Sequence, residues 1–383
     1  MGWKVDFLAT APPGDTSSGL SRGIWELSAE LAQRQHRVRV LYPAADLEPP
    51  PADARGVTPI PVPVVGVSRR PFGRDIAIGR NASALFDPAA DLVIGNDEKA
   101  GALEARWMRS TGRPVFAQFV HDIALHTFDT LRPLEAKRGL RQRFGNYFDR
   151  RTLERLEGKA LAHARLVVVG SRLNRELLDR YYDVPPDRVR HLPHGVPDPK
   201  DVGTVAEARA ALKIPLDVPV VVFVGRNPER QGLPIALEAF RRLRPLFPGA
   251  RFLVVGASAP SEPGVLSLGV VDETVKAQAY RASDVFLGPA RYEGFGLAPR
   301  EAMRYGIPAI VSSAVPLEGI PTDAVRVVNG MDSGEYSSAL AELLADPALR
   351  RTVGEAGKRA ADEFSYRRMA ELFEEIFRPV VGG

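Results

Sequence analysis

The chain has 383 residues, of which 45% are hydrophobic and 26% charged, the proportions of an ordinary globular protein long enough for two domains. It contains no cysteine, which excludes disulfide bonds, thiolate metal sites and a cysteine nucleophile. The formal net charge is only +4 and no recognised nucleic-acid-binding motif is present, so nucleic acid is not expected as a partner.

The apolar stretches of the chain have the length of strands. Residues 219–224, for example, fall far short of the roughly 20 apolar residues that a membrane-spanning helix needs. Near the N-terminus, Asp6 interrupts a short apolar stretch, so the first residues do not resemble a secretory signal. We therefore expect a cytoplasmic protein, with peripheral contact at the inner membrane face left open.

The first half of the chain alternates strands with helices. A helix is predicted over residues 19–34, because Leu20, Ile24, Leu27 and Leu31 fall on one face. Buried strands are predicted at residues 5–9, 38–41, 91–97, 115–120 and 166–171. This alternation predicts a parallel sheet, whose ligands sit at the carboxyl ends of the strands.

Polar residues and a glycine follow these strands and are candidates for binding. Gly19 lies in the turn after the first strand, Asp97 at the loop after the third, and His121 and Asp122 directly after the fourth. A lone histidine is more often structural, and nothing nearby in the sequence completes a metal site with His121. No glycine-rich dinucleotide or P-loop motif is present, which argues against an oxidoreductase or a P-loop enzyme.

Residues 132–155 form a strongly basic segment, with eight arginines and lysines against three acidic residues. One interpretation is a solvated helix face whose arginines extend along apolar neighbours. Another is attraction to an anionic membrane surface or to a lipid-phosphate acceptor. The sequence alone leaves both open.

The second half repeats the alternation. Strands are predicted at residues 219–224, 251–255, 266–271, 284–287 and 307–312, with helices between and after them. Arg226 follows Gly225 at the carboxyl end of the first of these strands, where a guanidinium is placed to meet a phosphate. We expect a first domain over residues 1–197, a second over 198–364, and a last helix within 365–383 that returns to the first.

The most specific feature is the stretch from Glu293 to Glu301, with the sequence EGFGLAPRE. It spans a strand-to-helix loop in which Gly294 and Gly296 let the backbone approach a ligand. The amides that open the following helix carry a partial positive charge suited to a diphosphate. The two carboxylates can accept hydrogen bonds from the hydroxyls of a hexose or a ribose.

Together with residues 282–287 and with Gly306-Ile307-Pro308, this stretch resembles the retaining glycosyltransferases of family 4. The resemblance implies an α/β protein of GT-B architecture, in which two Rossmann-like domains with parallel sheets face a central cleft. It implies catalytic roles for His121, Arg226 and Glu293. We expect Arg230 to act in catalysis as well, and Asp97 and Asp122 to contact the acceptor. The resemblance implies donor contacts from Gly19, Gly225, Gln231, Val270, Val271, Gly294, Phe295, Gly296, Leu297 and Glu301, the last of them to the ribose.

Gln231 is the main departure from the family pattern, because a lysine usually stands at this position. Losing that lysine would weaken stabilisation of the departing diphosphate. We expect Arg230, one residue earlier, to supply the charge instead, since arginine binds phosphate in a bidentate manner. The alternative is a slow enzyme, or one whose donor is held differently.

The expected function is retaining transfer of a sugar from a nucleotide-diphosphate sugar to a hydroxyl of a small molecule, glycan or lipid-linked acceptor. The resemblance implies no metal and no further cofactor. Two alternatives remain: a nucleotide-sugar-binding partner subunit with little turnover, and a nucleotide-sugar epimerase with the same fold.

Overall fold

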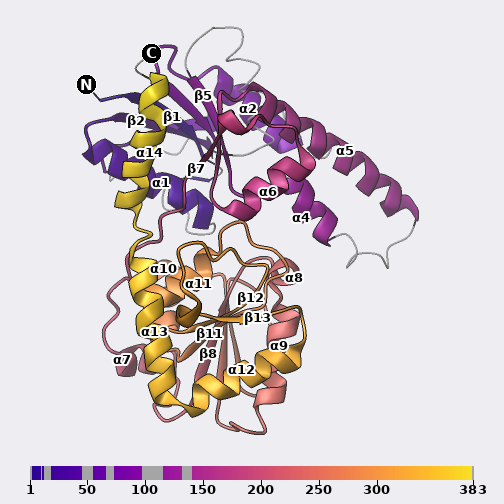
Figure 1. Cartoon of the computed structure of the whole chain (residues 1–383), viewed down its shortest axis with the longest axis vertical. Coiled ribbons are helices and arrows are strands. Elements are labelled where there is room, and N and C mark those ends of the chain that lie inside the picture. Colours follow the sequence, from indigo (N-terminus) through magenta and orange to yellow (C-terminus); the bar gives the residue numbers. More distant parts are fainter. Residues whose placement is uncertain are drawn as a thin grey trace. The chain divides into compact units, whose positions relative to one another are not determined.

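The computed structural model describes residues 2–9, 11–12, 19–44, 55–65, 73–96, 115–131 and 140–381. The chain forms two compact units, one of residues 1–195 with 366–383 and the other of residues 196–365 (Figure 1). The boundaries predicted after residues 197 and 364 lie close to the limits of these units. Each unit is built on one parallel β-sheet.

Within the described residues, the sheet of the first unit has seven parallel strands in the order β3-β2-β1-β4-β5-β6-β7. They are β1 Lys4–Leu8, β2 Arg37–Ala44, β3 Thr58–Pro63, β4 Leu92–Gly95, β5 Val115–Val120, β6 Leu166–Val169 and β7 Val189–His191. The strand order reverses between β1 and β4, the kind of position at which open parallel sheets bind ligands.

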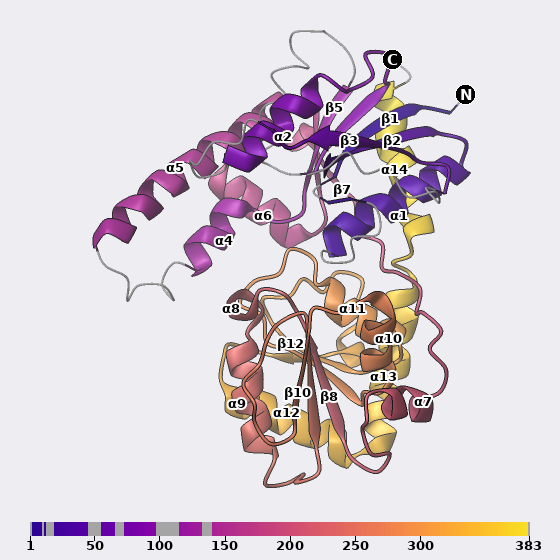
Figure 2. The same cartoon turned by 180° about the vertical axis from the view of Figure 1, so that it is seen from behind.

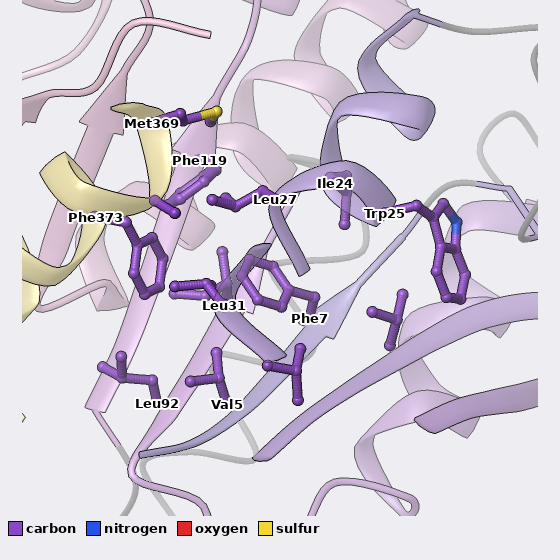
Figure 3. Packing of buried hydrophobic residues seen from close by; sticks show 14 of the residues in the cluster. Val5, Phe7, Ile24, Trp25, Leu27, Leu31, Leu92, Phe119, Met369 and Phe373 are labelled. Carbon is purple, nitrogen blue, oxygen red and sulfur yellow. The ribbon is translucent and has the colours of Figure 1, made fainter. Parts of the chain in front are cut away.

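The helices of this unit are α1 Gly19–Gln33, α2 Gly73–Ser83, α4 Ala124–Leu131, α5 Leu140–His163, α6 Arg172–Tyr181 and α14 Tyr366–Val381, with a 3-10 turn η2 Pro186–Arg188. Although α14 comes from the far end of the chain, it lies beside α1 (Figures 1 and 2). Phe373 of α14 packs against Phe7 and Phe119 of the sheet, with ring centroids 6.0 and 6.2 Å apart (Figure 3). The last helix therefore completes the core of the first unit.

The sheet of the second unit has six parallel strands within the described residues, in the order β10-β9-β8-β11-β12-β13. They are β8 Val220–Val224, β9 Arg251–Val255, β10 Val265–Gly269, β11 Val285–Gly288, β12 Ala309–Ser312 and β13 Arg326–Val328. The helical segments are α7 Val205–Ala211, α8 Pro228–Gln231, α9 Leu233–Leu243, α10 Glu273–Arg281, α11 Leu297–Arg304, η3 Thr322–Ala324, α12 Ser333–Ala345 and α13 Pro347–Asp362.

Helices cover both faces of this second sheet. Val220 and Val222 of β8 belong to the cluster that includes residues of α7, α10, α11 and α13, whereas Val221 and Phe223 belong to the cluster with α9 and α12. Successive side chains of a strand point to opposite faces, so a continuous apolar run is buried on both sides. This is the physical reason why β8 was predictable from sequence.

The structure confirms the predicted α/β class and the two Rossmann-like sheets, but it contains short strands that the sequence analysis missed. In β3, three prolines alternate with other residues, and proline cannot donate to a ladder. The strand is tolerated because β3 lies at the edge of its sheet. β7 and β13 have three residues each, too few to show a periodic pattern.

Candidate active site

The strand order of the second unit reverses between β8 and β11, which are neighbours in the sheet. All its strand pairs are parallel, so the carboxyl ends of the strands meet at one edge. The loop from Gly225 follows β8, and the loop that carries Glu293 follows β11. A reversal of this kind is where α/β sheets bind their ligands.

The loop after β8 is shaped by glycine. A Cβ atom on Gly225 would overlap the side chain of Gln231, so the absence of a side chain makes room for that residue. Arg226 follows and is exposed. Asn227 then caps the short helix α8, because its Oδ1 accepts a hydrogen bond of 3.0 Å from the N–H of Arg230. The cap fixes the backbone from which Arg230 and Gln231 project.

The side chains of Arg230 and Gln231 converge on Glu293. The Nε2 of Gln231 donates to Oε1 of Glu293 at 3.0 Å, while its own Oε1 accepts from the N–H of Asn227 at 3.0 Å. An Nη2 of Arg230 lies 3.8 Å from the other carboxylate oxygen of Glu293. Gln231, which stands where the family pattern has a lysine, therefore orients the carboxylate of Glu293. Arg230 places a positive charge beside that carboxylate.

Gly296 forms the sharp turn between Glu293 and the helix α11. Its φ of +77° lies in the left-handed region that favours glycine, and a Cβ there would come within 2.7 Å of a methyl group of Val315. As the N-cap residue of α11, Gly296 has no side chain that could accept a hydrogen bond from the first amides of the helix. The first amides of α11, from Leu297 onwards, thus begin directly after Gly294-Phe295-Gly296 and carry the partial positive charge of a helix N-terminus.

Arg300 braces this turn from inside, a role the sequence analysis missed. It is 1% exposed and donates to the carbonyls of Phe295, of Gly296 at 3.3 Å and of Pro316 at 3.0 Å. Its guanidinium carbon also lies 4.1 Å from the centre of the Phe295 ring. Burial lowers the pKa of Arg300 to about 10, which still leaves it charged at neutral pH.

Glu301 lies one turn into α11 and is buried, at 6% exposure. The hydroxyl of Tyr280 donates to its Oε2 at 3.1 Å, and Nζ of Lys276 lies 3.3 Å from the same oxygen. Lys276 also pairs with Glu273 at 2.9 Å, one helical turn earlier on α10. Tyr280 and Lys276 hold the Glu301 carboxylate in place, and neither had been singled out from sequence.

Val270 and Val271, which are predicted to contact the donor, lie at the same edge of this sheet. Val270 and Val271 follow β10 directly, and Val270 is 64% exposed. The N–H of Gly256, after β9, donates to the carbonyl of Gly269 at 2.7 Å and so ties the ends of β9 and β10 together. The contact of Val270 and Val271 with the donor stays a prediction.

In the first unit, His121 lies directly after β5 and is 8% exposed. Its Nδ1 lies 3.2 Å from Nε2 of His194, which follows β7, and its carbonyl accepts a 2.7 Å hydrogen bond from the amide of Asn174. Burial lowers the pKa of His121 to about 4, so the imidazole is neutral at pH 7. The partnership with His194 could not be read from the sequence.

Of the other residues predicted to bind in the first unit, the structure describes Gly19 and Asp122. Gly19 is exposed and begins α1, and Asp122 is half-buried beside His121. Asp97 lies outside the described residues, but its neighbour Asn96 is buried after β4 and donates to the carbonyl of Leu8 at 2.8 Å. Asn96 thus lies where the strand order reverses, between β1 and β4.

The basic segment 132–155 is described only in part. Residues 132–139 lie outside the described residues, and helix α5 begins at residue 140. Arg150, within that helix, forms a two-pronged contact with Asp129 at 3.0 and 3.1 Å. Contact of this segment with a membrane stays a prediction. Among the helices of the described residues, none has the length and apolar character needed to cross a membrane.

The candidate residues of the second unit therefore come together at one sheet edge, whereas His121 marks the corresponding edge of the first. Within the described ranges, no three histidine or acidic side chains converge as a metal site would require. Two oriented carboxylates can accept hydrogen bonds from hydroxyl groups, and the arginines and helix amides can donate hydrogen bonds to phosphate.

Comparison with known proteins agrees with this arrangement. Residues 204–360 match the family described as "Glycosyl transferases group 1", and residues 17–198 match "Glycosyltransferase Family 4". The alpha-maltose-1-phosphate synthase of Mycolicibacterium smegmatis is 30% identical over 342 residues, which cover 79% of this chain and 85% of that protein.

The D-inositol 3-phosphate glycosyltransferases of Saccharomonospora viridis and Segniliparus rotundus are 30% and 31% identical, over 58% and 60% of this chain. The matches cover 57% and 56% of those two proteins, so the chain spans little more than half of their length.

Solved structures show the same fold. Sucrose-phosphate synthase from Thermosynechococcus elongatus superimposes with a TM-score of 0.81 at 22% identity, covering 99% of both chains. Anabaena HepE in complex with UDP and glucose gives a TM-score of 0.76 at 15% identity, covering 98% of this chain and 99% of that one. With both halves matched and a relative aligned over most of its length, the chain belongs to glycosyltransferase family 4 and has the GT-B fold.

Proposed function

We propose that this chain transfers a sugar from a nucleotide-diphosphate sugar to a hydroxyl of a phosphorylated sugar or polyol, with retention at the anomeric carbon and without a metal ion. The observation that carries the proposal is the cluster of Arg230, Gln231 and Glu293 at the point where the strand order of the second sheet reverses. The nucleotide would bind to this second unit and the acceptor to the first.

The diphosphate is assigned to the positive groups of the second unit. Arg226 is exposed at the end of β8, Arg230 lies next to Glu293, and the amides that open α11 follow Gly296. Charge-assisted hydrogen bonds from arginine to phosphate are stronger than neutral ones and would contribute about 1.5–3 kcal/mol each. These groups would stabilise the negative charge that grows on the leaving diphosphate.

The carboxylates are assigned to hydroxyl groups at the two ends of the donor. Glu293, held by Gln231, would accept hydrogen bonds from the donor sugar. Glu301, held by Tyr280 and Lys276, would accept them from the ribose. A carboxylate that neighbouring side chains already orient loses little freedom when the ligand binds. The contacts that hold Glu293 and Glu301 in place therefore favour affinity for the donor.

The reaction would proceed by attack on the face from which the diphosphate leaves. A bond forms between the acceptor oxygen and the anomeric carbon, the bond from that carbon to the phosphate oxygen breaks, and the leaving phosphate oxygen takes the acceptor's proton. The chain supplies position and charge stabilisation, not a covalent nucleophile. His121, neutral at pH 7, would lie beside the donor sugar as a hydrogen-bonding group.

The acceptor class is suggested by the names of the relatives. Inositol 3-phosphate stands in the name of one group and maltose 1-phosphate in that of another, so a phosphate on a polyhydroxylated molecule is common to both. We therefore place phosphorylated sugars and polyols ahead of glycans, natural products and lipid-linked acceptors.

A matrix of donors and acceptors tests the proposal. The full chain is incubated with UDP-, GDP-, ADP- or dTDP-sugars, each with inositol phosphates, hexose phosphates and their unphosphorylated forms, with and without EDTA. Mass spectrometry should detect a glycosylated phosphate ester with at least one donor, at the same rate in EDTA. Products from unphosphorylated acceptors alone would overturn the acceptor class, and an EDTA-sensitive rate would overturn metal independence.

Gln231 motivates a second candidate, a partner subunit that binds a nucleotide sugar with little turnover. Tight donor binding in calorimetry without transfer to any acceptor or to water would favour it. An epimerase of the same fold would instead convert one nucleotide sugar into another in the absence of an acceptor, which the same mass-spectrometric samples, separated by chromatography, would show.

A further inference from the structure

Two buried histidines face each other at the carboxyl edge of the first sheet. His121 follows β5 and His194 follows β7, and they are 8% and 7% exposed. Nδ1 of His121 lies 3.2 Å from Nε2 of His194, with ring centroids 4.9 Å apart. At this separation the two nitrogens share one hydrogen, because two N–H groups would collide and two lone pairs would repel each other.

The backbone makes this contact a fixed part of the fold. A Cβ atom on Gly170, at the end of β6, would lie 2.8 Å from Nε2 of His194, so the imidazole occupies the space that this glycine leaves. The N–H of Leu192 donates to the carbonyl of Val169 at 2.9 Å, which holds the start of the segment that carries His194. The ring of His194 is therefore placed by the edge of the sheet itself.

The second nitrogen of His121 is the one left for a ligand. Its Nε2 is buried and has no hydrogen-bond partner within the part of the chain that the structure describes. Buried polar atoms nearly always have a partner, so an unpartnered one at a ligand-binding edge points to a ligand atom. Because burial keeps the ring neutral at pH 7, this nitrogen is either a donor or an acceptor, and the bond at Nδ1 decides which.

We propose that His194 is a positioning residue whose Nε2–H donates to Nδ1 of His121 and so keeps the proton of His121 on Nε2. His121 then presents a hydrogen-bond donor on Nε2. A donor is what an oxygen of the sugar or phosphate needs as it gains negative charge. The identity of that ligand as a nucleotide sugar rests on the proposed function.

Nitrogen NMR of the full chain labelled with 15N-histidine tests the proposal. The signals of His121 are identified by their loss in His121→Gln, and the wild type should show the pattern of a neutral ring protonated on Nε2. In His194→Leu, which removes the donor, His121 should become a mixture of both neutral forms. The kcat/KM should fall roughly 10- to 100-fold, as when a group that orients a functional histidine is lost.

His194→Asn provides the matched control, because its amide N–H can still donate to Nδ1. It should keep the Nε2 pattern and most of the activity. Gly170→Ala displaces the ring of His194 without altering either histidine, and it should shift the His121 signals as His194→Leu does.

A His121 proton on Nδ1 in the wild type would overturn the inference, and so would an unchanged His121 pattern in both His194→Leu and Gly170→Ala. The NMR measurement needs no turnover. Failure to find any transferase activity would thus reject the proposed function while leaving the result on the proton position intact.

Discussion

Arg300→Met should destabilise the second unit by several kcal/mol, because Arg300 is a fully buried cation that serves backbone carbonyls. Its guanidinium donates to the carbonyls of Phe295 and Pro316, the latter at 3.0 Å, with longer contacts to Gly296 and Glu318 at 3.3 and 3.4 Å. Methionine fills a similar length but offers no donor. Counting about 1–3 kcal/mol for each of the two best-placed carbonyls that lose their partner gives a loss of about 4 kcal/mol.

Urea unfolding followed by circular dichroism measures this loss. The matched control is Arg242→Met, whose arginine is 56% exposed and pairs only at the surface with Glu238, so its change should stay within about 1 kcal/mol. Arg300→Lys should fall between wild type and Arg300→Met, since a single ammonium cannot reach the same set of carbonyls. A free energy of unfolding for Arg300→Met within about 1 kcal/mol of wild type would refute the bracing role.

Three further outcomes are expected. Arg230→Ala should lower kcat by about 100-fold or more, as when one group that stabilises a charged transition state is removed. Adding Gln231→Lys to this variant should recover much of the loss. Wild-type turnover in Arg230→Ala would show that Arg230 does not stabilise the diphosphate. Lys276→Met should raise the KM for the donor roughly tenfold with little change in kcat, since Lys276 holds Glu301 in place for donor binding. A fall in kcat alone would contradict this. His121 stays neutral in the folded chain down to about pH 4, whereas an unfolded histidine binds a proton below about pH 6.5, so the free energy of unfolding should fall by about 3 kcal/mol as the pH drops through this window. Urea unfolding of His121→Gln should lack this fall. The same pH dependence in His121→Gln and wild type would show that His121 is not its source.

The central strands of both units were predictable where they are continuous apolar runs. Val220–Val224 is buried on both faces, and so its sequence shows the pattern without help from distant residues. The edge strand Thr58–Pro63 has no such pattern, since proline is a poor strand former and is accepted only where one side of the strand is unpaired.

The candidate site was predictable where one short stretch holds several of its residues. Glu293, Gly296 and Glu301 are close in sequence, and the turn and helix between them follow from local rules. The partners of these residues come from other elements. Tyr280 is 21 residues from Glu301, and Gln231 is 62 residues from Glu293.

Such long-range pairs have no signature in a single sequence, because nothing local to either partner specifies the other. The sequence suggests that Arg300 is an ordinary exposed arginine of a helix. In the structure it is buried and donates to the backbone carbonyls of Phe295 and Gly296. His194 pairs with His121 across 73 residues only because β5, β6 and β7 lie side by side in the sheet.

The anomeric configuration of the product tests the central claim most directly. The best donor and acceptor pair is converted by the full chain, and proton NMR of the new glycosidic bond is recorded alongside the same reaction with Glu293→Gln. We predict that the bond has the configuration of the donor sugar and that the variant forms it far more slowly. A product of inverted configuration, or no transfer from any nucleotide sugar, would contradict the account.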